Sequence, residues 1–355
     1  MASGGKDAIF RGVNTSAIPD LPDCIQLSYL AEGAANIIYR FSVPLGHPSG
    51  IDPTLPPHVD KTHLLRLRKG VPSAVKSLPA FVALHNTFYP LFSRELILNT
   101  HIIGIPRSLV ERENLVLKDR EASGNRPAKR AGLYLIGPPP PDTTSHGNDG
   151  LRQLEQYEHY GFLVEDMTPS VDISRREVLV EFKPKWLLPS PTTPQGARRC
   201  RTCALRALRV FDKHGVTVVG NGSPNPGYWC PLDLASGELQ RMQRAVKGIL
   251  SQKGTLKTGW KGGVSEDERV ILETKVIEYF IGTRGSKLLG LLKQYQSDWD
   301  PCGPVDLFGE SGDINTEPLV RSGESGVWGD EWTEGVKKYL MAMTVRDFSL
   351  FLKVS

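Results

Sequence analysis

The sequence predicts an α+β protein with a β-rich first half and a helix-rich second half, arranged as two lobes with a cleft between them. Three observations lead to this prediction. Apolar and polar residues alternate over residues 26–68, whereas apolar residues recur at helical spacing over residues 236–281. The chain has 355 residues, which is enough for two domains. We place the lobes at residues 1–168 and 169–355.

The composition is that of an ordinary soluble protein. Charged residues make up 23% of the chain and hydrophobic residues 39%. No apolar run is long enough for a membrane span, and the first residues lack the apolar stretch of a signal peptide. Five cysteines, an odd number, argue against a disulfide framework. We therefore expect a protein of the nucleus or cytoplasm that is not secreted.

The first lobe begins with a strand, a turn of small residues and a second strand over residues 26–43. The turn "AEGAAN" could bring backbone N–H groups close to a phosphate, although small residues in a hairpin are usually only a turn. "HLLRLRK", residues 63–69, predicts a further strand with Arg66 on the face opposite the leucines. Residues 78–99 predict helix, and the polar, proline-rich residues 118–150 predict a flexible insertion.

The second lobe begins after a buried strand, "HYGFLVEDMT", and a short turn. "EVLVEFKPK" predicts another strand, and "RRCRTCALRALRVFDKHG" a basic helix. The segment "SGELQRMQRAVKGILSQ" places Leu239, Met242, Val246 and Ile249 on one helix face. Ser265, three residues before Glu268, predicts a capping box, and "KKYLMAMTVRDFSLFLKVS" predicts a helix followed by a strand.

The stretch "EFKPK" carries the main functional signal. On a strand, Glu181, Lys183 and Lys185 would share one face, with the two ammonium groups roughly 7 Å apart. Pro184 donates no hydrogen bond and therefore marks a strand end or edge. Two close cations are favourable where anions lie between them, and Glu181 could orient one lysine. The alternative is a surface strand whose lysines reach only water.

Basic residues are concentrated around this stretch. Residues 176–209 contain eight Lys or Arg and two Glu, an excess larger than the +4 net charge of the whole chain. Such a cluster indicates an anionic partner or, equally, a solvated helix face. Nucleic acid is a distant alternative because stacking aromatics are not interleaved. Cys200 and Cys203 could bind zinc only with two more ligands, of which Cys230 and His214 are nearest; their spacing is unusual, so we expect packed side chains.

Five segments together resemble the inositol-pentakisphosphate 2-kinase family, in its fungal form: "AEGAANIIYRF", "HLLRLRK", "EFKPKW", "YWCPLDLASG" and "MTVRDFSLF". The resemblance implies a divergent protein-kinase-like bilobal fold. It also implies transfer of the ATP γ-phosphate, with Mg²⁺, to the 2-hydroxyl of inositol 1,3,4,5,6-pentakisphosphate. The product would be inositol hexakisphosphate (phytate). Nuclear residence and a monomeric state are expected by the same likeness.

The resemblance also assigns roles to residues. It implies nucleotide contacts by Glu32, Gly33, Ala34, Asn36 and Arg66, with Glu165, Asp166 and Met167 as the hinge against adenine. Lys183 and Asp347 would be catalytic, Asp347 also contacting magnesium. Lys185 would bind the inositol phosphates, as would Arg126, with Arg198, Arg199 and Arg201 added on charge grounds.

Two departures from the family pattern leave alternatives open. Ala34 stands where relatives often carry glycine, and a D-x-x-x-K-P segment expected after the last strand is not found among the 355 residues. The second departure favours a non-catalytic inositol-polyphosphate-binding protein on the same scaffold. Another small-molecule kinase of similar architecture is the third reading.

Overall fold

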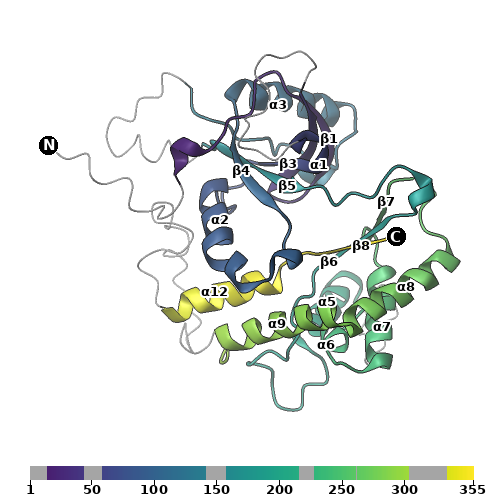
Figure 1. The fold of residues 1–355 in the computed structure, drawn as a ribbon. Coiled ribbons are helices and arrows are strands. Elements are labelled where there is room, and N and C mark those ends of the chain that lie inside the picture. The colour runs from purple at the N-terminus through teal and green to yellow at the C-terminus, as the bar shows by residue number, and fades with distance from the viewer. Residues whose placement is uncertain (1–13, 44–57, 141–156, 216–227, 261, 304–333) are drawn as a thin grey trace. The chain divides into compact units, whose positions relative to one another are not determined.

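A computed structural model describes residues 14–43, 58–140, 157–215, 228–260, 262–303 and 334–355 (Figure 1). The described residues form two compact units, one ending at Asp166 and the other beginning at Met167. Both contain helices and antiparallel sheet, which confirms the α+β class. None of the helices in these ranges combines the length and apolar character needed to span a bilayer.

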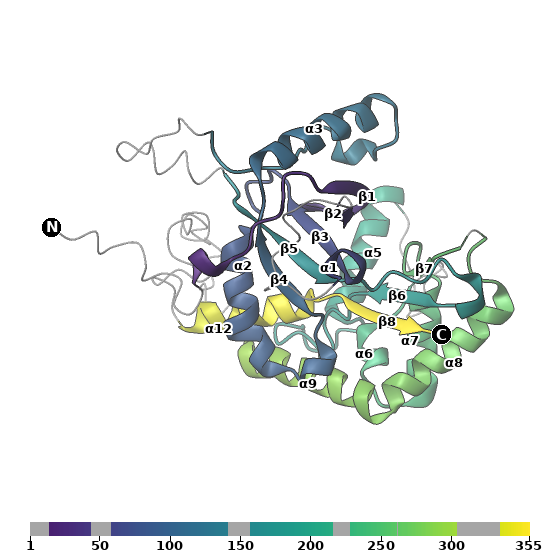
Figure 2. The same ribbon diagram turned by 45° about the horizontal axis from the view of Figure 1, so that its top comes forward.

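The first unit is built on a five-stranded antiparallel sheet in the order β1-β2-β3-β5-β4 (Figure 2). Its strands are β1 (Gln26–Glu32), β2 (Asn36–Ser42), β3 (His63–Arg68), β4 (Thr100–Gly104) and β5 (Tyr160–Glu165). The predicted hairpin and the two predicted strands at residues 63–69 and 159–168 are confirmed. Because β1 and β2 are joined directly, the turn between them projects from the end of this sheet.

The core of the first unit lies between this sheet and helix α3 (Arg107–Ala122). Ile37 and Leu65 of the sheet and Leu109 of the helix are all fully buried in one apolar cluster. Each such side chain contributes roughly 1.5–3 kcal/mol by leaving water. Two shorter helices, α1 (Val59–Thr62) and α2 (Ser77–Ala83), complete the unit. This rigid support holds the turn of residues 33–35 in place.

Two predictions for the first unit were wrong in part. Helix was expected over residues 78–99, but α2 ends at Ala83 and passes into a π turn at Leu84–Phe88 and short 3-10 turns. Pro90 lacks the N–H that a continuing helix requires. The insertion expected over residues 118–150 is instead structured up to residue 140, because α3 extends to Ala122 and Arg126 and Leu135 are buried. Residues 141–150 lie outside the described residues.

The second unit contains a three-stranded antiparallel sheet with β6 (Val178–Phe182) between β7 (Leu256–Thr258) and β8 (Leu350–Val354). Val178, Val180 and Phe182 are buried, as their alternation predicts. The two views show β8 beside β6 (Figures 1 and 2). The strand that ends the chain therefore pairs with the strand that precedes "KPK".

Six described helices accompany this sheet: α5 (Arg201–His214), α6 (Pro231–Leu234), α7 (Leu239–Leu250), α8 (Glu266–Ile281), α9 (Thr283–Trp299) and α12 (Glu334–Arg346). The capping box of Ser265 and Glu268 is confirmed. On α7, Met242, Val246 and Ile249 are buried as predicted, but Leu239 is exposed because it opens the helix. The helix and strand predicted at the end of the chain are α12 and β8.

Candidate active site

Two lysines and one aspartate form an accessible cluster in the second unit. Lys183 Nζ lies 2.5 Å from Asp347 Oδ2, and Lys185 Nζ lies 2.6 Å from Asp347 Oδ1. The side chains are 41%, 38% and 58% exposed, in the order Lys183, Lys185, Asp347. One carboxylate is thus held between two ammonium groups that solvent or a ligand can reach.

The two lysines converge for a different reason than the predicted one. β6 ends at Phe182, so Lys183 and Lys185 lie beyond the strand and do not share its face. Lys185 instead has a positive φ of 61°, a conformation that costs a residue with a Cβ of order 1 kcal/mol or more. The expected contact of Glu181 with a lysine of "KPK" was also wrong, because Glu181 pairs with Lys257 of β7. Attraction to Asp347, together with the left-handed turn, brings the ammonium groups together.

A buried glutamine holds the strained segment. The side chain of Gln296, on α9, accepts a hydrogen bond from the Leu187 N–H and donates one to the Lys185 carbonyl oxygen, both 2.9 Å long. Gln296 is only 2% exposed, so both bonds are shielded from water. The backbone on either side of Trp186 is therefore fixed to α9, which supports the unusual conformation of Lys185.

Arg346, the residue before Asp347, is held by several buried contacts. Arg346 is buried, pairs with Asp300 at 2.6 Å, and donates to the Gln296 carbonyl oxygen. Its guanidinium also lies 3.6 Å from the centre of the Trp186 ring. Cation–π and buried ionic contacts of this kind hold the end of α12 in one position. As a result, the neighbouring Asp347 presents its carboxylate to the lysines.

The charge state of Asp347 follows from its neighbours. Partial burial would raise the pKa of its carboxyl group, but hydrogen bonds and attraction from Lys183 and Lys185 outweigh it and lower the pKa. Asp347 is therefore an anion at neutral pH. With two cations and one anion, the cluster carries net positive charge and suits a ligand with several phosphates.

Lys69, a residue to which the sequence analysis assigned no role, supports the turn between β1 and β2. Lys69 Nζ donates to the Gly33 carbonyl oxygen at 2.8 Å and to Glu32 Oε2 at 3.2 Å. The Lys69 N–H also donates to the Ala35 carbonyl oxygen.

A side chain at position 33 would meet only the Asn36 carbonyl oxygen, at 4.0 Å. Ala34 is not among the described non-glycine residues with positive φ, so alanine in place of glycine is unstrained there.

Glu32 and Arg126 are not free to contact a ligand in this structure. The Arg126 guanidinium donates two hydrogen bonds of 3.0 Å to the Glu32 carboxylate and also pairs with Glu121. The side chains of Glu32, Lys69 and Arg126 are at most 1% exposed. Burial would raise the pKa of Glu32, yet hydrogen bonds from Arg126 and Lys69 lower it. In this structure the two residues support the turn, and the nucleotide contact predicted for Glu32 and the substrate contact predicted for Arg126 stay predictions.

Arg66, on β3, is a cation without a carboxylate partner among the described residues. Its guanidinium lies 4.1 Å from the centre of the Phe162 ring, and its Nε is buried without a hydrogen-bond partner. Burial lowers the pKa of Arg66 to about 10, so it stays charged at neutral pH. A buried, unsatisfied donor on a cation is a feature that an anionic ligand would satisfy.

The predicted hinge residues lie where the first unit passes into the second. Glu165 ends β5 and accepts a hydrogen bond from the Asn99 N–H at 3.1 Å. Asp166 pairs with Arg40 at 3.1 Å, and Met167 is the first residue of the second unit. The side chains of Glu165 and Asp166 are thus engaged within the first unit, and their N–H groups donate to the carbonyl oxygens of Asn99 and Thr62.

Of the three arginines predicted on charge grounds, one contacts a residue that follows the lysines in the chain. The Arg201 guanidinium lies 4.9 Å from the ring of Trp186, the residue after Lys185. Arg198 and Arg199 precede α5, and Arg198 is exposed. Sequence reasoning missed Gln296, Asp300 and Arg346. A glutamine at an apolar position of α9 was the only local signal for the first, and no local pattern marks the other two.

Comparison with known proteins identifies the family of the chain. A family model described as inositol-pentakisphosphate 2-kinase matches residues 29–355, which include the β1–β2 turn, both lysines and Asp347. The chain belongs to the inositol-pentakisphosphate 2-kinase family. Over 70 residues it is 63% identical to the inositol-pentakisphosphate 2-kinase of Yarrowia lipolytica (strain CLIB 122 / E 150). That match covers 20% of the chain and 19% of the relative, so the matched segment spans about a fifth of the relative's length. The family resemblance predicted from the five motifs is confirmed.

Proposed function

We propose that the protein transfers the γ-phosphoryl group of ATP to the 2-hydroxyl of inositol 1,3,4,5,6-pentakisphosphate, giving inositol hexakisphosphate. The observation that carries this proposal is the carboxylate of Asp347 held between Lys183 and Lys185 in a chain of this kinase family. Phosphoryl transfer depends mainly on positioning and on neutralising negative charge. The cluster supplies both a positioned carboxylate and two cations.

In this proposal the first unit binds ATP. Two features support the assignment: the open space beside Gly33 and the unsatisfied Nε of Arg66. The backbone of Gly33, Ala34 and Asn36 would cover the phosphates, and Arg66 would donate to them. Residues 165–167 would contact adenine. Glu32, Lys69 and Arg126 would keep the turn in shape without touching the nucleotide.

The second unit binds the acceptor. Lys183 would bind the phosphoryl group that is transferred, and Lys185 and Arg201 would bind phosphates on the inositol ring. Asp347 would orient the 2-hydroxyl and take its proton on a carboxylate oxygen, since its lowered pKa makes it an anion and a weak base. In this proposal the fold is of the protein-kinase type, in which a β-rich lobe binds the nucleotide and a helix-rich lobe binds the acceptor.

Mg²⁺ fits the donor set at Asp347. Magnesium in kinases is usually held by one or two carboxylates together with substrate phosphates and water. Asp347 offers a carboxylate, and its side chain is more than half exposed. The bound ion would neutralise phosphate charge. When it binds, Lys183 and Lys185 would move their bonds from Asp347 to the phosphates that arrive with it.

The test is turnover by the full chain. Incubation with ATP, Mg²⁺ and inositol pentakisphosphate should yield the hexakisphosphate, detected by anion-exchange chromatography. Asp347→Asn should reduce kcat by about 10²–10⁴, the usual contribution of a general base, and leave inositol pentakisphosphate bound. Lys353→Ala, which removes a lysine of β8 that pairs with Glu177, is the control and should keep normal turnover.

Other outcomes would reject the proposal. Binding of the pentakisphosphate without product in the wild-type chain would favour the non-catalytic binding protein. Phosphorylation of another small alcohol would favour a different kinase. The expected monomeric state and the location in nucleus or cytoplasm stay predictions, to be checked by light scattering and by imaging of the tagged protein.

A further inference from the structure

One glutamine of α9 contacts both of the segments that build the lysine–aspartate cluster. The side chain of Gln296 bonds to the Lys185 carbonyl oxygen and to the Leu187 N–H. The main-chain carbonyl oxygen of Gln296 accepts a hydrogen bond of 3.2 Å from Arg346, the residue before Asp347. Lys185 and Asp347 are 162 residues apart in the chain. Gln296 therefore links the two segments whose side chains form the cluster.

The backbone before Lys185 has little freedom of its own. Phe182 ends β6 and is buried against Trp229, with the ring centres 5.8 Å apart in an edge-to-face contact. Pro184 is buried, has a fixed φ and restricts Lys183 to extended conformations. The conformation of Lys185 is therefore the point at which this segment can change direction.

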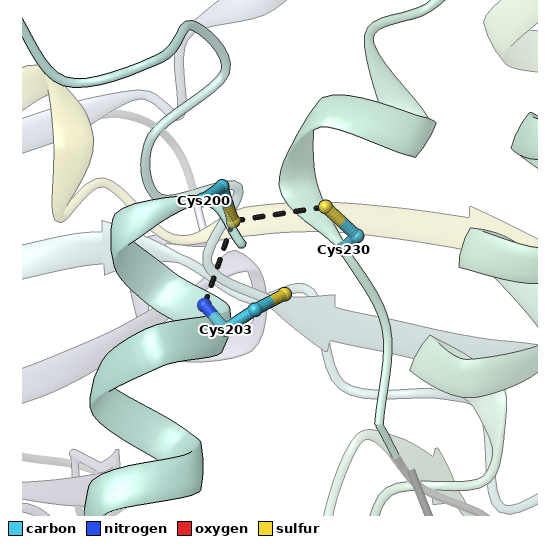
Figure 3. A group of neighbouring side chains, drawn as sticks. All are labelled: Cys200, Cys203 and Cys230. Carbon is cyan, nitrogen blue, oxygen red and sulfur yellow. Dashed lines mark hydrogen bonds between the residues drawn. The ribbon is translucent and has the colours of Figure 1, made fainter. Parts of the chain in front are cut away.

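The support behind Trp229 is a closely packed part of the second unit. Cys230, the next residue, lies beside Cys200 and Cys203 at the start of α5, and the three sulfur atoms are within 4.8 Å of one another (Figure 3). Cys200 Sγ and Cys230 Sγ are 3.7 Å apart. Further along α5, Arg206 donates to the Trp229 carbonyl oxygen. The beginning of the lysine segment thus rests on tertiary contacts that are independent of α9.

The left-handed conformation of Lys185 depends on the contacts with Gln296. A residue with a Cβ disfavours positive φ, and the φ of Lys185 is 61°. The two bonds from the buried Gln296 amide are shielded from water and offset that cost. In this conformation the Lys185 ammonium group lies 2.6 Å from Asp347. A change to negative φ would rotate the Lys185 side chain away from that carboxylate.

We propose that Gln296 is a positioning residue for binding of the phosphorylated acceptor, because it holds Lys185 in the conformation in which both lysines face one carboxylate. This inference rests on the proposed function, in which Lys185 binds phosphates of inositol pentakisphosphate. Gln296 is 2% exposed and acts only through the backbone of its neighbours. Measured affinity falls with the fraction of chains in the competent conformation, so a variant in which about one chain in ten keeps it binds about 10-fold more weakly.

The test is a double-mutant cycle on binding of inositol pentakisphosphate by the full chain, measured by isothermal titration. Gln296→Met keeps the length of the side chain but removes the amide, and it should weaken binding by about 10-fold. In a Lys185→Ala background the same substitution should change the affinity by less than about 2-fold, because no ammonium group is left to position. Gln294→Met is the matched control, because Gln294 is an exposed glutamine of the same helix, and it should bind as wild type does.

A second measurement uses only the wild-type chain and covers the case in which Gln296→Met does not fold. The Leu187 N–H donates to Gln296 Oε1 in a buried position. Its exchange with deuterium should therefore be at least about 100-fold slower than that of an unprotected amide. Mass spectrometry of overlapping peptides that cover residues 183–188 measures this rate.

The outcomes separate the positioning role from the proposed function. Wild-type affinity in Gln296→Met, or an equal loss of affinity in both backgrounds, would overturn the positioning role alone. Rapid exchange of the Leu187 N–H in the wild-type chain would do the same. A wild-type chain that binds no inositol pentakisphosphate would overturn the proposed function, and the positioning role with it.

Discussion

The two units contain the same grouping of charges in opposite surroundings. In the first unit, Lys69 and Arg126 pair with the carboxylate of Glu32, and the three side chains are at most 1% exposed. In the second unit, Lys183 and Lys185 pair with Asp347, and the side chains are 38–58% exposed. Two cations and one anion therefore serve structure at one place and are available for chemistry at the other.

Burial decides which role each group can have. Removing one member of a buried ion pair leaves an uncompensated charge and costs about 3–5 kcal/mol. An exposed pair contributes about 0–1 kcal/mol, because water already stabilises its charges. Lys183 and Lys185 can thus exchange Asp347 for phosphate oxygens at low cost. Lys69 and Arg126 cannot leave Glu32 without destabilising the turn that they hold.

The largest expected effect is on the stability of the first unit. Glu32→Gln removes the anion between Lys69 and Arg126 and should lower the free energy of unfolding by about 3–5 kcal/mol. Urea denaturation followed by circular dichroism measures this change. Glu111→Gln, which breaks the exposed pair with Arg107, is the control and should change the free energy by less than about 1 kcal/mol. Equal effects of the two substitutions would show that the buried group is not structural.

The next effect is on ligand binding by the exposed cluster. Lys185→Ala should weaken binding of inositol pentakisphosphate by about 10- to 100-fold, the equivalent of one charge-assisted hydrogen bond of roughly 1.5–3 kcal/mol. Lys183→Ala should instead act mainly on kcat. Isothermal titration and steady-state kinetics separate the two. Both variants should unfold at nearly the wild-type urea concentration, and a shift confined to ATP affinity in Lys185→Ala would reverse the roles of the lysines.

The smallest effect is on acid stability. The pKa of Glu32 is lower in the folded protein than in the unfolded chain, so its contribution to stability is present above the unfolded pKa. It is lost as the pH falls through the lowered folded value. The free energy of unfolding should therefore fall less steeply below about pH 4.5 in Glu32→Gln than in wild type. Asp347→Asn should flatten the slope less, because the pKa of Asp347 is also lowered but its ion pairs are exposed and screened by water. A slope as flat as that of Glu32→Gln would contradict the comparison.

Much of the local structure follows from the sequence alone. Alternation at residues 37–41 is enough for the β1–β2 hairpin, since one strand face must be apolar for burial. Ser265 and Glu268 mark the start of α8 because they satisfy each other's backbone N–H groups. The family motifs also pointed to Lys183, Lys185 and Asp347. These signals are local in the chain, or are short motifs, and can be read without coordinates.

Tertiary structure alone decided what surrounds each charge. Asp347 is 164 residues from Lys183, and Arg126 is 94 residues from Glu32. Periodicity says which face of an element is apolar, but not which distant segment will cover a charged side chain. Hence Arg126 could be recognised as a cation from the sequence, yet its burial against Glu32 could not. The meeting of Cys230 with Cys200 and Cys203 has the same origin, because chain folding, not spacing, sets the distance between the sulfur atoms.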